Sequence, residues 1–361
     1  MNKPTKPAFD TAKLETFMGR VIGDLAGAFS IGPVQIGSEL GLYAAMARTG
    51  AVTPEELAAH SGCAVRYVTE WLCHQAASGY VEHDGDSGRF TLPPEHAFAL
   101  ADRDSPAYIV PGFATAAALW DNKAKVAEAF RSGEGVAFSH QSGCIACSIA
   151  EFFRPGYRAH LIDSWLPALD GVVDKLKAGA KVADIGCGHG HTTRIMAEAF
   201  PNATFVGVDI DPASIDEARA HAKAHGAGDN LDYQTGTAQD FEGGGFDFIT
   251  CFDALHDMGD PVGAARHIHA ALKPAGKWMI VEPYANDALE NNNTPINRMS
   301  YAASMMTCVP AALAQDGGYA LGAQAGQTRL REVIVDKGGF SRLRRATETP
   351  LNLILEASKG L

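Results

Sequence analysis

The stretch Val182-Ala-Asp-Ile-Gly-Cys-Gly-His-Gly190 organises this chain of 361 residues. An apolar strand predicted from Lys181 to Ile185 runs straight into three glycines spaced two apart. A helical pattern follows from Thr192 to Phe200. Glycine suits a sharp turn that lies against a ligand, because it has no Cβ. The unpaired N–H groups at the start of the following helix favour a carboxylate or a phosphate. The stretch therefore predicts a ligand site between a strand and a helix.

The spacing of these glycines distinguishes between cofactors. A dinucleotide fold has G-x-G-x-x-G after its first strand, and the position of the last glycine is His191 here. Downstream, a second predicted strand from Thr204 to Val208 ends in Asp209, about 20 residues beyond the glycines. An acid at that distance hydrogen-bonds a ribose diol in folds of this kind. Because His191 replaces the last glycine of the dinucleotide pattern, a cofactor that bears a pyrophosphate fits this loop less well.

Loop, helix, strand and acid together resemble the class I S-adenosylmethionine-dependent methyltransferases. The resemblance implies that S-adenosylmethionine is the cofactor. It also implies that the acid of the first strand and the three glycines wrap the methionine and ribose end, while the acid of the second strand holds the ribose. These residues are Asp184, Gly186, Gly188, Gly190 and Asp209. The alternative is an ordinary strand-turn-helix in an α/β core, and the agreement of the four features argues against it.

The adenine end of the cofactor site is predicted with two alternatives. The segment from Gly236 to Asp240 follows a third predicted strand, where members of the family place an acid and a small residue around the adenine. Thr237 stands in place of the usual acid, so Ala238 together with Asp240 is an equal alternative. Ile210, next to the ribose-binding acid, completes the expected cofactor contacts.

Regular alternation of strands and helices continues to the end of the chain. It predicts a doubly wound, seven-stranded, Rossmann-like α/β sheet over residues 179–361, which closes with a hairpin. The segment 284–327 interrupts this alternation and is expected to form part of a substrate lid. The further strands are predicted at residues 231–235, 246–251, 277–281, 341–347 and 352–358, and the further helices at residues 261–272 and 330–337.

Composition limits the classes of partner. The formal net charge of −12 argues against a general nucleic-acid or anionic-membrane partner. No secretory signal is recognised in residues 1–8, and the most apolar early region, residues 21–46, is interrupted by polar residues and cannot span a bilayer. Seven scattered cysteines fit a reducing compartment better than a disulfide framework. We therefore expect a cytoplasmic protein.

The N-terminal residues 1–104 resemble a winged helix. Thr53 and Glu56 form a predicted capping box, a second helix is expected at residues 64–77, and a hairpin at residues 79–82 and 89–92. Many small-molecule O-methyltransferases carry such a domain for dimerisation. The resemblance therefore implies a homodimer.

A winged helix also suggests a DNA-binding regulator that senses the cofactor. Between residues 54 and 104, however, three arginines and no lysine face nine acidic residues. So few cations cannot neutralise several phosphates. Packing against a second subunit is the favoured interpretation, and nucleic-acid binding is the less favoured alternative.

Residues 105–178 are predicted to form a helical linker that covers the cofactor site. They contain His140, Cys144 and Cys147, which would share one face if all three lay on a helix, as in half of a metal site. Only three ligands are present, and unpaired cysteines are usually small buried apolar residues. The favoured interpretation is therefore that no metal binds here, with pocket lining as a secondary role.

The acceptor side of the reaction is predicted from Phe252-Asp-Ala-Leu-His-Asp-Met258, directly after the fourth strand. It resembles the Leu-His-Asp-Trp stretch of plant-type O-methyltransferases, which implies that His256 is the general base. Glu282, at the end of the fifth strand, stands where that family has a flanking acid. His256, Asp257 and Glu282 are the predicted catalytic residues, and the alternative is that Asp257 only caps a turn. The family's lysine is replaced by Phe252, which could pack against the sulfonium.

These observations predict an S-adenosylmethionine-dependent methyltransferase that acts on a small-molecule hydroxyl group. Methyl transfer to sulfur or nitrogen is the alternative with the same cofactor site, since a deprotonating base matters less there. The sequence does not choose the acceptor. Bacterial methyltransferases that resemble this chain and contain the same Leu-His-Asp-Met sequence do not identify the methyl acceptor, because many have no known substrate.

Overall fold

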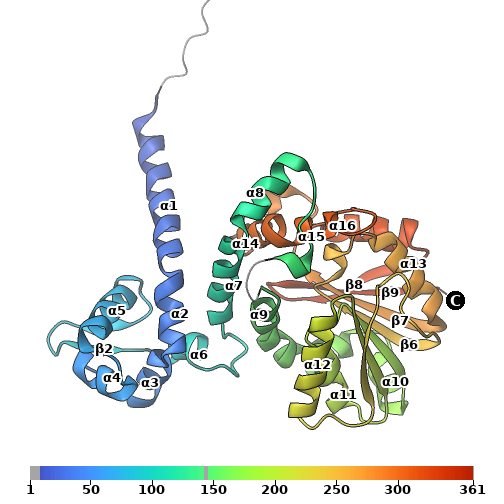
Figure 1. Cartoon of the computed structure of the whole chain (residues 1–361), viewed down its shortest axis with the longest axis horizontal. Helices are drawn as coiled ribbons and strands as arrows, with labels where there is room; N and C mark the ends of the chain where they lie inside the picture. Colours follow the sequence, from blue (N-terminus) through green and yellow to red (C-terminus); the bar gives the residue numbers. More distant parts are fainter. Residues whose placement is uncertain (1–8, 142–144, 361) are drawn as a thin grey trace, which may run out of the picture. The chain divides into compact units, whose positions relative to one another are not determined.

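The computed structural model describes residues 9–141 and 145–360 of the chain. Its contacts divide the chain after Ala117 into an N-terminal and a C-terminal unit, which are described separately (Figure 1). The elements of the N-terminal unit are α1 (Thr11–Phe29), α2 (Ile31–Glu39), α3 (Leu42–Thr49), α4 (Pro54–Ser61), α5 (Val65–Ala77), β1 (Glu82–Asp84), β2 (Arg89–Thr91) and α6 (Pro94–Leu100), and α7 (Val110–Asp121) crosses the boundary.

Helices α3, α4 and α5 and the β1–β2 hairpin pack around one apolar core, as the winged-helix resemblance implies. The predicted capping box is present at the start of α4. The backbone N–H of Thr53 donates to Glu56 Oε2 at 2.9 Å, and the N–H of Glu56 donates to Thr53 Oγ1 at 3.3 Å. Arg89 of β2 pairs with Glu56 at 2.8 Å, so this cation is engaged within the unit itself.

The first strand of the hairpin lies later than predicted. Residues 79–81 of the strand expected at 79–82 form a turn, and β1 begins at Glu82. The backbone N–H groups of Tyr80 and Val81 donate to the carbonyl oxygen of Gln75, at 2.9 and 3.4 Å. Because these donors close the C-terminal end of α5, they are not available for a strand ladder.

The C-terminal unit contains the seven-stranded sheet. Its α-helices and strands are α8 (Lys123–Ser132), α9 (Ile145–His160), α10 (Val172–Ala178), β3 (Lys181–Ile185), α11 (His191–Ala199), β4 (Thr204–Asp209), α12 (Pro212–Ala224), β5 (Leu231–Thr235), β6 (Phe246–Phe252), α13 (Pro261–Ala271), β7 (Leu272–Pro283), α14 (Pro295–Ala303), α15 (Val309–Leu313), α16 (Gly326–Arg331), β8 (Arg342–Glu348) and β9 (Asn352–Ser358). Short 3₁₀ turns occupy Phe138–His140, Leu166–Ala168, Leu255–Asp257 and Leu289–Asn291, and π-helical turns occupy Leu161–Trp165, Ser304–Cys308 and Glu332–Lys337.

The strand order is β5-β4-β3-β6-β7-β9-β8. The first five strands are parallel, and β9 pairs antiparallel with both β7 and β8. This arrangement confirms the doubly wound sheet that closes with a hairpin. β7 begins at Leu272, earlier than the predicted residue 277, and the predicted helix at 330–337 is a short α16 followed by a π-helical turn.

Both faces of the sheet are buried. Along β3, Val182 belongs to a core cluster with α10 and α11, whereas Ala183 and Ile185 belong to a cluster with α13 and α16. This alternation follows from the period of two along a strand. Burial on both faces explains why the strands read as nearly continuous apolar runs.

The order of the strands reverses between β3 and β6. In doubly wound sheets, ligands bind in the crevice outside the carboxyl ends of the strands at such a switch point. The glycine-rich loop follows β3, and the segment that carries His256 follows β6. The fold therefore brings the two predicted halves of the site next to each other. No described helix combines the length and apolar composition needed to cross a membrane.

Candidate functional site

The three glycines of the loop after β3 all adopt positive φ angles, at +73° for Gly186, +50° for Gly188 and +73° for Gly190. The backbone N–H of Gly186 donates to the carbonyl oxygen of Val208 at 2.8 Å, which fastens the loop to β4. The N–H of Gly188 donates to Asp209 Oδ2 at 2.8 Å. The loop and the acid of the second strand are thus joined directly.

Gly190 lies too close to Tyr233 to carry a side chain. A Cβ at Gly190 would stand 2.4 Å from the Tyr233 hydroxyl oxygen, whereas a Cβ at Gly188 would meet nothing within 4 Å. We expect Gly190→Ala to lower the free energy of unfolding by roughly 2–4 kcal/mol, because strain at positive φ adds to overpacking. Urea denaturation measures this change. Gly188→Ala is the matched control with strain alone, and an equal loss in both variants would contradict the packing argument.

Asp184 of β3 connects the start of α11 to β6 through hydrogen bonds. Its carboxylate is buried and accepts hydrogen bonds from the hydroxyl groups of Thr192 and Thr193, both at 2.7 Å, and of Thr250 at 2.8 Å. Burial raises its pKa, and these three hydrogen bonds oppose the rise. Asp184 does not border the cavity described next, so its oxygens fix the start of α11 against β6 instead.

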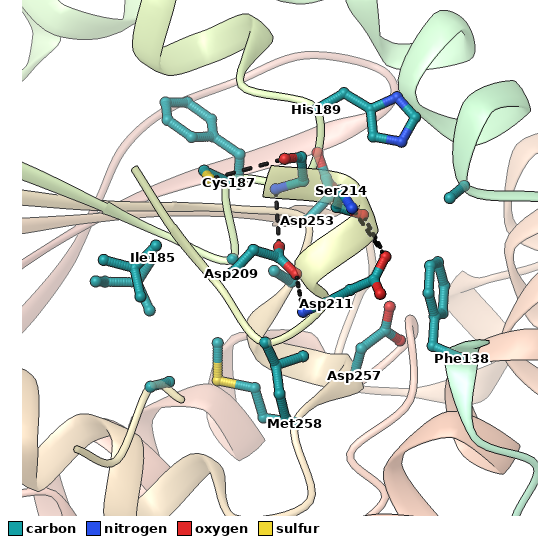
Figure 2. Close-up of a pocket in the computed structure, with 18 of the residues that line it drawn as sticks. Phe138, Ile185, Cys187, His189, Asp209, Asp211, Ser214, Asp253, Asp257 and Met258 are labelled. Atoms are coloured by element: carbon teal, nitrogen blue, oxygen red, sulfur yellow. Dashed lines mark hydrogen bonds between the residues drawn. The ribbon is translucent and has the colours of Figure 1, made fainter. Parts of the chain in front are cut away.

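A cavity opens over the carboxyl ends of the strands (Figure 2). Residues predicted to bind the cofactor that border it are Gly186, Gly188, Asp209, Ile210, Thr237, Ala238 and Phe252. The others, Asp184, Gly190 and Asp240, do not border it: Asp184 and Gly190 are buried, and Asp240 is exposed. Asp240 is turned towards its own loop, where Oδ1 accepts from the backbone N–H of Thr237 at 3.3 Å.

Asp209 accepts hydrogen bonds from two backbone segments of the site. Its Oδ1 accepts from the backbone N–H of Asp211 at 2.9 Å, while its Oδ2 accepts from Gly188. Burial raises the pKa of Asp209, and the two backbone donors oppose the rise. A carboxylate oxygen has room for a second hydrogen bond. Asp209 can therefore support the loop and still receive a diol from the cavity.

His256 and Glu282 form a buried pair at the ends of neighbouring strands. Nδ1 of His256 donates to Oε2 of Glu282 at 2.6 Å, and the two residues are 3% and 2% exposed. On the other side of the ring, Nε2 lies 3.3 Å from Asp257 Oδ1. Burial alone lowers the pKa of His256, but the Glu282 and Asp257 carboxylates outweigh it and hold that pKa well above its usual value. Asp257 borders the cavity, whereas His256 and Glu282 lie behind it.

Asp253 is a residue of the site that the sequence did not single out. It borders the cavity, and its φ of +48° places it in the left-handed region. Tyr157 of α9 donates its hydroxyl to Oδ2 at 2.6 Å, and Asn352 of β9 donates its side-chain amide to Oδ1 at 2.9 Å. Asp253 thus fastens the helix that covers the cavity to the edge of the sheet.

The surroundings of Asp253 predict a pH dependence of stability. Burial raises its pKa from 3.8 to about 7, and the hydrogen bond from Tyr157 opposes the rise. Between these values the folded state binds the proton more tightly than the unfolded state. Stability therefore falls as pH rises from about 4 to about 7, by at most about 1.4 kcal/mol for each pH unit.

Asp253→Asn isolates this contribution, because it keeps the shape and loses the titration. We expect the variant to gain stability relative to the parent protein as pH rises through this window. Paired urea denaturation at pH 4.5, 6 and 7.5 measures the difference. A constant difference across the three pH values would show that the carboxyl group does not titrate in this range.

The candidate half-site for a metal in the linker is not formed as predicted. His140 lies in the 3₁₀ turn Phe138–His140 and Cys147 lies in α9, so these two residues belong to different elements. Cys144 lies outside the described residues. Cys147 is disulfide-bonded, which differs from the expected free thiol. Other linker residues do cover the cavity, among them Phe138, Ile149, Phe153 and Tyr157.

Comparison with protein families matches residues 176–338 to a family described as a methyltransferase domain, and residues 28–102 to a Rv2258c-like winged HTH domain. Residues 176–338 are a methyltransferase domain. Similar solved structures share this architecture over nearly the whole chain. The mitomycin 7-O-methyltransferase MmcR has a TM-score of 0.70 and 19% identity, and covers 97% of this chain and 100% of its own. Human N-acetylserotonin methyltransferase, solved with S-adenosylmethionine, has a TM-score of 0.69 and 16% identity over 99% and 100% of the two chains. At these identities the likeness establishes the fold.

Curated relatives match little more than a quarter of the chain. The ubiquinone biosynthesis O-methyltransferase of Actinobacillus pleuropneumoniae is 37% identical over 105 residues, which are 27% of this chain and 43% of the relative. The enzyme of the same name from Pseudomonas aeruginosa is 37% identical over 103 residues, 28% of this chain and 43% of the relative. The chain therefore spans less than half the length of these relatives.

The cofactor that this methyltransferase domain implies is S-adenosylmethionine, and the cavity fits it. The position of a Cβ on Gly188 is open, so the loop backbone can lie against a ligand. Asp209 offers a carboxylate for the ribose diol, and Ile210 and Ala238 offer apolar surface for an adenine. Phe252 borders the same cavity, and its ring meets that of Tyr157 edge-on at 5.5 Å.

Proposed function

We propose that the protein is an S-adenosylmethionine-dependent methyltransferase that methylates a hydroxyl group of a small molecule, with His256 as the general base. The observation that carries the proposal is the His256–Glu282 pair, with 2.6 Å between Nδ1 and Oε2, beside the cavity of a methyltransferase domain. When bound, the cofactor supplies a methyl group on a sulfonium. The protein then has to orient the acceptor, exclude water and take one proton.

Orientation and exclusion of water come from the walls of the cavity. The loop after β3, Asp209 and the segment after Asp209 would hold the cofactor. Phe252 and Tyr157 form an apolar end with negative ring faces, which suits a sulfonium. Phe138 and Phe153 cover the cavity from the linker, and Ala311 and Gln315 contribute from the proposed lid, residues 284–327. The position of Phe138 and Phe153 on the cavity supports the proposed role of the linker as a cover over the cofactor site.

Proton removal is proposed to run through Asp257 to His256. Glu282 holds the proton on Nδ1, so Nε2 is the atom of the ring that can accept another. Asp257 borders the cavity and lies 3.3 Å from Nε2. An acceptor hydroxyl that donates to the Asp257 carboxylate would therefore pass its proton on to Nε2. Glu282 acts as a positioning residue, because it touches only the histidine.

Methyl transfer to sulfur or nitrogen is the alternative within the same cofactor site. A panel of phenols, hydroxy acids, thiols and amines, incubated with cofactor and protein, tests the choice through the methylated product. Dependence on His256 only for hydroxyl acceptors supports the proposal. Transfer to thiols or amines alone would replace it. A structure with the cofactor product bound would show the size and charge of the space for the acceptor.

A homodimer is proposed from the surface of α1. This helix has no buried residue, and its exposed apolar side chains include Leu14, Met18, Val21 and Leu25, at alternating intervals of four and three residues. Such spacing forms the seam of a two-helix coiled coil. The charges of α1 sum to zero, so two copies do not repel each other. Light scattering that shows only monomers at micromolar concentration would contradict this proposal.

Nucleic-acid binding is not supported by the winged helix. Arg66 pairs with Glu70 at 2.5 Å, and Arg89 pairs with Glu56. We therefore propose that this domain serves assembly. The cytoplasmic location is a proposal: five of the six described cysteines are free, which supports it, whereas the disulfide at Cys147 does not. The domain limits 1–104, 105–178 and 179–361 are likewise proposed; the family matches at 28–102 and 176–338 support two of the three domains, without fixing their limits.

A further inference from the structure

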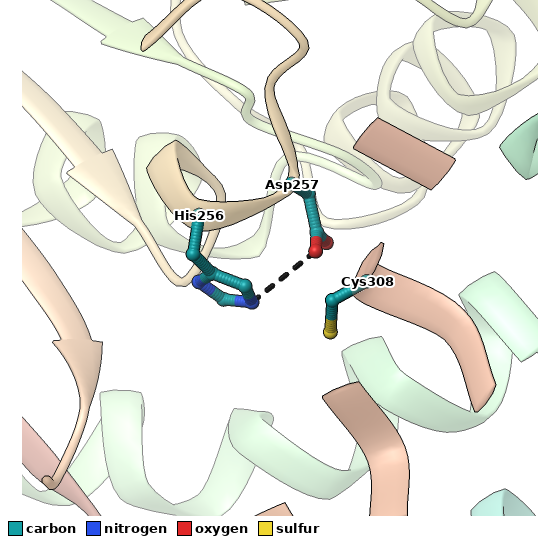
Figure 3. A group of neighbouring side chains, drawn as sticks. All are labelled: His256, Asp257 and Cys308. Carbon is teal, nitrogen blue, oxygen red and sulfur yellow. Dashed lines mark ion pairs between the residues drawn. The ribbon is translucent and has the colours of Figure 1, made fainter. Parts of the chain in front are cut away.

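The proposed base, His256, and two other side chains of different chemistry lie close together. Nε2 or Nδ1 of His256, a carboxylate oxygen of Asp257 and Sγ of Cys308 lie within 4.8 Å of one another (Figure 3). His256 and Asp257 come from the 3₁₀ turn after β6, and Cys308 ends the π-helical turn between α14 and α15. The fold brings together residues about fifty positions apart in the sequence.

This cluster contains polar atoms without partners. Asp257 Oδ1 and Glu282 Oε1 are buried and make no hydrogen bond to any residue that the structure describes. A buried carboxylate oxygen without a donor is costly. Oδ1 lies towards the histidine ring, 3.3 Å from Nε2, which allows an ion pair with the protonated ring but not a hydrogen bond. A metal ion between Nε2 and Oδ1 would take the place of that ring proton and bind the Asp257 carboxylate directly.

The second layer of the cluster resembles that of metal centres. A histidine that binds a metal commonly donates its other ring N–H to a carboxylate, which fixes the ring and its tautomer. Glu282 provides this contact at 2.6 Å from Nδ1 and leaves Nε2 directed towards Asp257. Imidazole, carboxylate and thiolate form a donor set suited to Zn²⁺ and related ions, whereas Mg²⁺ and Ca²⁺ prefer oxygen ligands alone.

We propose that His256, Asp257 and Cys308 bind a Zn²⁺-like divalent ion through Nε2, a carboxylate oxygen and Sγ. Binding releases the thiol proton of Cys308 to solvent, and the ion keeps a fourth position for water. One consequence rests on the proposed function: Nε2 cannot bind the ion and accept the acceptor's proton at the same time. Occupation of this site therefore inhibits methyl transfer, and a chelator restores it.

Cobalt provides a direct test, because a thiolate bound to Co²⁺ absorbs in the near ultraviolet. Chelator-treated full-length protein is titrated with Co²⁺, and we expect saturation at one ion per chain with this absorption. Zn²⁺ should displace Co²⁺ and bleach the band, whereas Mg²⁺ should not. Absence of the band from the parent protein would overturn the proposal without any variant.

Variants assign the ligands. Cys308→Ser is expected to lose the near-ultraviolet band, and Asp257→Asn to weaken binding at least tenfold with the band retained. Glu282→Gln should weaken binding by roughly 10–100-fold, as loss of an outer contact does. Cys73→Ser, at an exposed free cysteine, is the matched control and should titrate like the parent. An unchanged band in Cys308→Ser, or its loss in Cys73→Ser, would overturn the assignment.

Methyl transfer separates this proposal from the proposed function. Transfer is measured in chelator and again with saturating Zn²⁺, and we expect activity only in chelator. If cobalt binds but the metal-free protein shows no His256-dependent transfer, the function proposal fails and the metal site stands. If cobalt does not bind and transfer occurs, the metal site alone fails.

Discussion

Replacement of His256 by alanine is expected to lower the turnover number by roughly 10²–10⁴-fold, which is the usual contribution of a general base. The acceptor would still bind against Asp257, but the Nε2 atom that takes its proton would be gone. Cofactor affinity should stay within about threefold, because His256 does not border the cavity. Turnover with a hydroxyl acceptor and titration calorimetry with S-adenosylhomocysteine, both in chelator, measure the two quantities.

Alanine also leaves the Glu282 carboxylate buried without its donor, so stability must be measured alongside activity. His256→Gln provides an amide that can donate to Glu282 without acting as a base. His225→Ala, at an exposed histidine of the same domain, is the matched control. Unchanged turnover in both His256 variants would remove this residue from the mechanism.

The pH profile gives the same prediction a second measurement. The Glu282 and Asp257 carboxylates hold the pKa of His256 well above its usual value, although burial opposes them. The neutral ring, which is the base, therefore forms only at higher pH. We expect kcat/KM to rise with pH through a pKa above 6.5, and Glu282→Gln to move this rise to lower pH. An identical profile in the variant would show that Glu282 does not set the titration.

Asp209→Ala is expected to weaken S-adenosylhomocysteine binding by roughly 10²-fold or more. Two hydrogen bonds from a ribose diol to a carboxylate contribute about 1.5–3 kcal/mol each. The substitution also frees the backbone N–H groups of Gly188 and Asp211, which loosens the loop that the cofactor needs. Titration calorimetry measures the dissociation constant.

Asp216→Ala is the matched control for charge, because Asp216 is an exposed acid on α12 that pairs only with Arg219, at 3.4 Å. Asp209→Asn keeps one acceptor oxygen for the loop while it removes the charge, so its loss should be intermediate. A dissociation constant of the Asp209→Ala variant within about threefold of the parent value would contradict the assignment of the ribose site.

Local patterns predicted most of the fold because each strand and helix has its own signals. The glycines after β3 and the apolar runs of β3, β4 and β6 lie within a few residues of the structures they specify. The strand predicted at residues 79–82 was wrong because the donors of Tyr80 and Val81 are used by the end of α5. The π-helical turn at Ser304–Cys308 has no comparable local signal.

The proximity of candidate site residues could be expected where strand ends bring them together, but not where tertiary contacts do. His256 follows β6 and Glu282 lies at the end of β7, so their approach could be expected from the sheet. Asp253 gains its role from Tyr157 and Asn352, which lie 96 and 99 residues away along the chain. Cys308 gains its position from a turn in the proposed lid. No pattern in the sequence joins these residues.

Because the backbone at Asp253 is left-handed, selection for heat tolerance and selection for catalysis favour different residues at this position. An aspartate at φ +48° costs about 1–2 kcal/mol, which glycine would not incur. Laboratory evolution screened for heat tolerance alone would therefore be drawn to glycine at this position. It would gain a more durable protein whose cavity cover had lost its attachment to the sheet. A screen that also scores catalysis would be expected to keep the acid and find its heat tolerance elsewhere.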